Sequence, residues 1–128
     1  MKLRIRGDTL RLRLKQGEVA QVAEGKSIVE TMHFPGSVLT YRLDVSENDA
    51  IEATYEGTNL LISLPAAKIA AWANTDEVSL TGEQAVSDDT SLKLLIEKDF
   101  SCLDPGHGRE GEDDADTFPH PSAGAGCG

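Results

Sequence analysis

The sequence predicts an α+β fold that is mostly β, built from two copies of one strand-strand-helix-strand-strand unit. Apolar and charged residues alternate in several runs, as where Leu10, Leu12 and Leu14 lie between basic residues, and this period of two is typical of half-buried strands. Short stretches with helical spacing separate the runs. The stretch 7–22 also recurs as 57–72. Two such units are expected to form one compact pseudo-twofold barrel or sandwich.

The first half begins with two alternating strands joined by a turn at Gly7-Asp8, because glycine tolerates the positive φ of tight turns. Val19, Val22 and Ala23 then follow helical spacing, and Gly25 is expected to stop that helix. The strands are expected at 2–6, 10–15, 27–33 and 39–45, and the helix at 16–24.

The second half follows the same order. Pro65 is expected at the first helical position, where its missing N–H would have no partner in any case. Ile69, Trp72 and Ala73 repeat the helical spacing. The strands are expected at 51–56, 60–64, 76–81 and 92–96.

An ungapped offset of 50 aligns the two copies. Between 7–31 and 57–81 six positions are identical: Gly7/Gly57, Leu10/Leu60, Leu14/Leu64, Ala20/Ala70, Ala23/Ala73 and Thr31/Thr81. Three further pairs keep their character: Leu12/Ile62, Val19/Ile69 and Ile28/Val78. Since these positions would face a core, the repeat is interpreted as a duplication that specifies packing.

The composition suggests one duplicated domain at 1–100, with halves at about 1–46 and 50–100. Residues 101–128 are rich in glycine, proline and acid, which predicts a tail that is partly docked or disordered. The chain has a net charge of −10, and the tail contributes one arginine against six acidic residues. So acidic a chain makes nucleic acid a poor expected partner.

No apolar run is long enough to span a membrane, and the alternating N-terminus does not look like a signal peptide. We therefore expect a cytoplasmic protein, with the two cysteines as thiols. The expected partner is an unknown protein or small molecule, and the expected state is a monomer or a homodimer.

A basic stripe is expected on one face of the first hairpin. An anion-binding patch there would use Arg4, Arg6, Arg11 and Arg13. The alternative is a solvated face balanced by Asp44, Glu52 and Glu56 on neighbouring strands. The second copy favours the alternative, because Leu61 and Ser63 replace the two arginines of the second strand.

The tail contains most residues capable of chemistry. A metal site would use Cys102, His107, Asp114, Asp116 and His120, which are ligand types that suit zinc. A nucleophilic pair of Cys102 with His107 or His120 is a second hypothesis. Neither has the spacing of a known motif, so no cofactor and no catalytic residue is the leading expectation.

The segment GTNLLISLPAAKIAAWANTDEVSL, at 57–80, resembles the strand-proline-helix-strand pattern of AbrB-type and other cradle-loop barrel domains. Such domains usually pair two chains, and the AbrB type binds DNA. The resemblance implies a similar fold with both copies in one chain, and a nucleic-acid-binding regulator as a third function.

The strings IEKDFSCL and EDDADTFPHP, on a chain that begins MKLRIRGDTLRLRL, resemble a family of small uncharacterised bacterial proteins. That resemblance implies that 97–121 belong to the protein's own design and carries no activity with it. The leading prediction is a small soluble binding or scaffold domain without identifiable catalysis. A metal-binding or thiol-dependent enzyme that uses the tail is the alternative.

Overall fold

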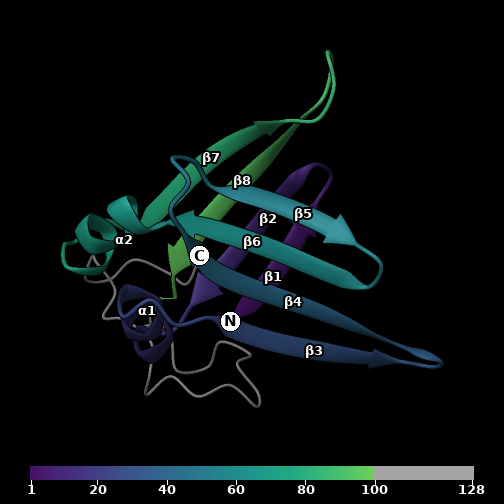
Figure 1. The fold of residues 1–128 in the computed structure, drawn as a ribbon, viewed down its shortest axis with the longest axis horizontal. Coiled ribbons are helices and arrows are strands. Elements are labelled where there is room, and N and C mark those ends of the chain that lie inside the picture. The colour runs from purple at the N-terminus through teal and green to yellow at the C-terminus, as the bar shows by residue number, and fades with distance from the viewer. Residues whose placement is uncertain (100–128) are drawn as a thin grey trace, which may run out of the picture.

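The element order of the protein repeats once along the chain (Figure 1). The computed structural model describes residues 1–99. The first half forms β1 (Lys2–Arg6), β2 (Thr9–Leu14), α1 (Gln16–Ala23), β3 (Ile28–Phe34) and β4 (Ser37–Ser46). The second half forms β5 (Glu52–Glu56), β6 (Asn59–Pro65), α2 (Ala66–Ala73), β7 (Ser79–Ala85) and β8 (Ser91–Lys98).

Each of two four-stranded sheets combines one hairpin from each half. Sheet A has the order β1-β2-β8-β7, and sheet B has the order β3-β4-β6-β5. The central pairs, β2 with β8 and β4 with β6, are parallel, and the outer pairs are antiparallel. The predicted fold class is confirmed, with two separate sheets in place of a closed barrel.

The two halves are related by an offset that changes along the chain. Ile28 pairs with Leu43, and its buried counterpart Leu80 pairs with Ile96, so the offset is 52 between β3 and β7 and 53 between β4 and β8. The predicted matches Ile28/Val78 and Thr31/Thr81 are therefore wrong. The connections from α2 to β7 and from β7 to β8 are both longer than their counterparts, so the offset grows along the second copy.

The core lies between the two sheets and is covered at one end by both helices (Figure 1). Its central side chains occupy equivalent positions in the two halves. These positions are Leu12 and Ile62, Leu14 and Leu64, Leu43 and Ile96, Val19 and Ile69, and Val22 and Trp72. These are the apolar positions of the strand and helix patterns. Burial of aliphatic surface, at about 25 cal/mol per Å², is therefore the main stabilising contribution.

The two helices begin differently. Pro65 ends β6 in an extended conformation and α2 begins at Ala66, so the predicted first helical position is wrong by one residue. At α1, one Glu18 carboxylate oxygen accepts a hydrogen bond from the Lys15 N–H at 2.8 Å, and the other lies 2.5 Å from the Met1 ammonium. Only α1 has a capping carboxylate, because position 68 is a lysine.

Replacing this carboxylate should weaken the helix that it caps. Glu18→Ala removes the acceptor for a backbone N–H, so a loss of about 1–2 kcal/mol in the free energy of unfolding is expected. Lys68→Ala, at the equivalent position of α2, should change that energy by less than about 0.5 kcal/mol. Urea denaturation measures the free energy of unfolding of both variants. A loss for Glu18→Ala no larger than the loss for Lys68→Ala would contradict a stabilising role of the cap.

Candidate functional site

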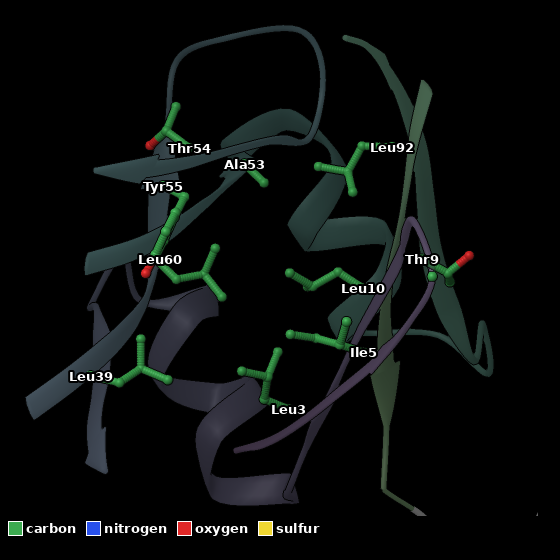
Figure 2. Close-up of a pocket in the computed structure, with 11 residues that line it drawn as sticks. Leu3, Ile5, Thr9, Leu10, Leu39, Ala53, Thr54, Tyr55, Leu60 and Leu92 are labelled. Carbon is green, nitrogen blue, oxygen red and sulfur yellow. The ribbon is translucent and has the colours of Figure 1, made fainter. Parts of the chain in front are cut away.

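An apolar cavity of about 410 Å³ lies between the two sheets. Most of its lining residues lie within a few positions of a hairpin turn, and Figure 2 shows their side chains on strands of both sheets. Leu3, Ile5 and Leu10 reach it from sheet A, and Leu39 and Leu60 reach it from sheet B. Strand alternation explains this on sheet A, because Leu3, Ile5 and Leu10 alternate with Arg4, Arg6 and Arg11, which face outward.

The cavity lies where the two halves of the repeat meet. Its lining contains equivalent positions from both halves: Leu3/Ala53, Ile5/Tyr55, Leu10/Leu60 and Leu39/Leu92. Residues close to a twofold axis face their own counterparts across it. The cavity therefore lies on the pseudo-twofold axis and is a product of the duplication itself.

A side-chain amide binds the backbone of the cavity residue Ala53. The Gln84 amide oxygen accepts from the Ala53 N–H at 2.8 Å, and its nitrogen donates to the Ala53 carbonyl at 3.1 Å. This contact joins β7 of sheet A to β5 of sheet B without a strand pairing. At the other seam the Met1 ammonium lies 2.8 Å from the Glu30 carboxylate, linking the chain start to β3.

The rim of the cavity exposes large apolar side chains. Ile5 is 63% exposed and Tyr55 is 69% exposed, although both alternate in sequence like core residues. Met32, which pairs with the cavity residue Leu39, is about half exposed on the inward side of the β3–β4 hairpin. Exposed apolar side chains grouped around an apolar cavity are typical of a binding site.

The basic stripe lies on the outer face of sheet A, on the side opposite the cavity. Register places Arg4 opposite Arg11 and Lys2 opposite Arg13. Glu97 of β8 lies 3.2 Å from Arg11 and 3.6 Å from Arg13, and Asp99 lies 3.3 Å from Lys2. Register and these contacts bring Arg4, Arg11 and Arg13 together, whereas Arg6 lies opposite Thr9 at the turn end of β1.

The acids predicted to balance the stripe belong to the other sheet. Glu52 and Glu56 are on β5 and Asp44 is on β4, so none is on a strand next to β1 or β2, and that expectation is wrong. Burial raises the pKa of Asp44, but hydrogen bonds from Ser27 and Arg42 outweigh burial and hold the pKa below its usual value. Asp44 is thus engaged within sheet B.

The tail residues predicted to bind a metal lie outside the described residues. These are Cys102, His107, Asp114, Asp116 and His120. Within residues 1–99 no group of three or more His, Cys, Asp or Glu side chains could hold a metal ion. The same part of the chain has no helix with the length and hydropathy to cross a membrane.

The cavity was not among the sites predicted from sequence. The available signal was that Ile5 and Tyr55, at equivalent positions, are both apolar and both lie two residues before a hairpin glycine. Side chains so close to a turn lie at the end of a strand, where fewer neighbouring side chains cover them. An apolar pair there could have indicated an exposed apolar surface.

Fold and site together define a class of protein: a duplicated, β-rich domain with an apolar cavity between its halves. The chain belongs to a family of unknown function (DUF7009), whose model matches residues 1–122. This confirms the resemblance to an uncharacterised family and includes most of the tail in the region that the family shares. No curated protein and no solved structure matches the chain.

Proposed function

We propose that the protein is a non-catalytic binding module whose ligand enters the cavity on the pseudo-twofold axis. The observation that carries the proposal is an apolar cavity with an exposed apolar rim, formed by the same positions of both halves. Its volume falls in the range of small-molecule sites, which is about 300–1,000 Å³. No catalytic constellation accompanies it within residues 1–99.

The lining indicates the chemistry of the ligand. Among the residues that line the cavity none is charged, and strand alternation turns the hydroxyls of Thr9 and Thr54 toward the outer faces, so Tyr55 supplies the polar group on the inner side. An ionised ligand group would lose its hydration there without a charged partner, which is costly. The ligand class that fits is therefore a neutral, largely apolar molecule, or an apolar side chain of a protein partner.

Binding of a neutral fluorescent probe tests the proposal. The full-length protein should bind N-phenyl-1-naphthylamine with enhanced fluorescence, because the dye leaves water for the cavity. Leu39→Trp, which fills part of the cavity, should weaken binding about tenfold or more, or about 1.4 kcal/mol. The neutral dye avoids attraction to the basic face of sheet A.

The adjacent residue supplies the control. Val38 precedes Leu39 on β4, points to the other face of sheet B and is 37% exposed, so Val38→Trp should bind the dye like the unmodified chain. Equal losses in both variants, or no dye binding at all, would contradict the cavity as the site. Circular dichroism of both variants confirms that the fold is kept.

A further inference from the structure

We propose that the chain's own acidic segment, residues 104–116, docks on the basic outer face of sheet A. This inference is independent of the cavity and of the function proposed for it. It joins a surface with an excess of positive charge to a nearby segment of opposite charge.

The basic face has more cations than its own acids balance. Cations come from three adjacent strands: Lys2, Arg4, Arg6, Arg11, Arg13 and Lys93. Three acidic residues share this face: Glu97 lies against two arginines, Asp99 lies against Lys2, and Glu83 is opposite Lys93 in register. Like charges directly across strands destabilise a sheet, so a polyanion on this face would relieve their repulsion.

The face is also shaped to receive a chain segment. A hollow of about 420 Å³ lies at the β1 edge of this face, where Lys2, Arg4, Arg11 and Arg13 line it together with Met1, Leu3 and Tyr41 of β4. The Nε atom of Arg11 is buried there, and its contact with Glu97 at 3.2 Å lacks the geometry of a hydrogen bond. A carboxylate in the hollow would supply an acceptor, and hydrogen bonds between guanidinium and carboxylate groups are among the strongest in proteins.

The remaining chain begins at the end of this face. Asp99 follows β8, and its N–H donates to the Leu14 carbonyl at 2.8 Å, so the described part of the chain ends at sheet A. At about 3.3–3.6 Å per extended residue, the five residues to Asp104 span at most about 18 Å. The segment 104–116 contains six acidic residues and one arginine, and it lies within the region matched by the family model.

The difference in charge between the two outer faces favours docking on sheet A over sheet B. At the positions of sheet B equivalent to Lys2, Arg4 and Arg6, the chain has Glu52, Thr54 and Glu56. Leu61 and Ser63 replace Arg11 and Arg13. The duplicated sheets thus share an apolar inner face and differ in outer charge, so that an acidic segment is attracted to one and repelled by the other.

A spin label within the segment tests the proposal on the full-length chain. Ala115→Cys, with Cys102→Ser and Cys127→Ser, places one label among the acids. At about 0.05 M salt the label should broaden the amide signals of β1 and β2 more than those of β5 and β6. At 1 M salt, where the Debye length falls to about 3 Å, this difference should shrink by half or more.

Removing charge from either the basic face or the acidic segment should also reduce the difference in broadening between β1–β2 and β5–β6. Arg4→Gln with Arg6→Gln replaces two exposed cations, and Asp113→Asn with Asp114→Asn acts on the segment. The matched control, Lys26→Gln with Lys68→Gln, removes the same charge from two exposed sites outside the sheets and should leave the broadening unchanged. Uniform broadening, or broadening centred on the cavity rim, would overturn the proposal.

Discussion

Cutting the chain between Asp49 and Ala50 is expected to unfold both fragments when they are separated. Fragment 1–49 would retain the β1–β2 hairpin and the β3–β4 hairpin, which belong to different sheets. Each would lose its parallel neighbour, β8 or β6. Isolated two-stranded hairpins are at best marginally stable in water, so neither fragment has a sheet that can persist alone.

Mixing the fragments provides the control. Fragments 1–49 and 50–128 together contain every strand pair, so an equimolar mixture should recover the circular dichroism and the amide dispersion of the intact chain. A fragment that folds only as a homodimer would be consistent with the same rule, because its second copy would supply the missing hairpins. A fragment that is folded as a monomer, with slow amide exchange, would contradict the pairing of hairpins between halves.

Trp72→Ala is expected to lower the free energy of unfolding by about 3–5 kcal/mol, a larger loss than removal of the Glu18 cap. Trp72 is fully buried on α2, and its indole N–H donates to the Val78 carbonyl at 3.2 Å. The Lys98 ammonium lies 5.9 Å from the ring centroid and donates to the Thr75 carbonyl at 2.8 Å. Burial lowers the pKa of Lys98, although Asp76 and Glu77 act in the opposite direction.

Two further variants separate volume from hydrogen bonding. Trp72→Phe should lower the free energy of unfolding by less than Trp72→Ala, since a ring still fills most of the space. The Val78 carbonyl also keeps one donor, because it accepts from the backbone N–H of Lys98 at 3.0 Å. Val86→Ala, at a side chain that is 64% exposed, should stay within about 0.5 kcal/mol. Urea denaturation midpoints, compared at constant m, measure the free energy of unfolding of the three variants. A small loss for Trp72→Ala would contradict the prediction and would show that neighbouring side chains move into the space left by the indole.

The local elements could be predicted from the sequence because their periods are clear. Alternation identified the strands around Leu12 and Ile62, and helical spacing identified Trp72 as a core residue. Period alone states which face of a strand is buried and does not state which strand lies beside it. The pairing of β2 with β8 therefore could not be predicted, and the balancing acids were assigned to the wrong sheet.

The candidate site was harder to predict for a related reason. Ile5 and Tyr55 have the alternation of core residues, yet both line the cavity and are more than half exposed. The residue types with recognisable chemistry gather instead in 101–128, outside the described part of the chain. A binding cavity made of leucines has no distinctive residue type, so it becomes visible only when both halves are assembled.

Methyl-detected NMR of the full-length chain, titrated with N-phenyl-1-naphthylamine, tests the central claim most directly. If the cavity is one site shared by both halves, the methyl signals of Leu10 and Leu39 should shift together with those of Leu60 and Leu92, with one dissociation constant. Leu61 and Leu95, on the outer faces of the sheets, should not shift. Shifts confined to one half, or centred on Leu61 and Leu95, would contradict an apolar binding site on the pseudo-twofold axis.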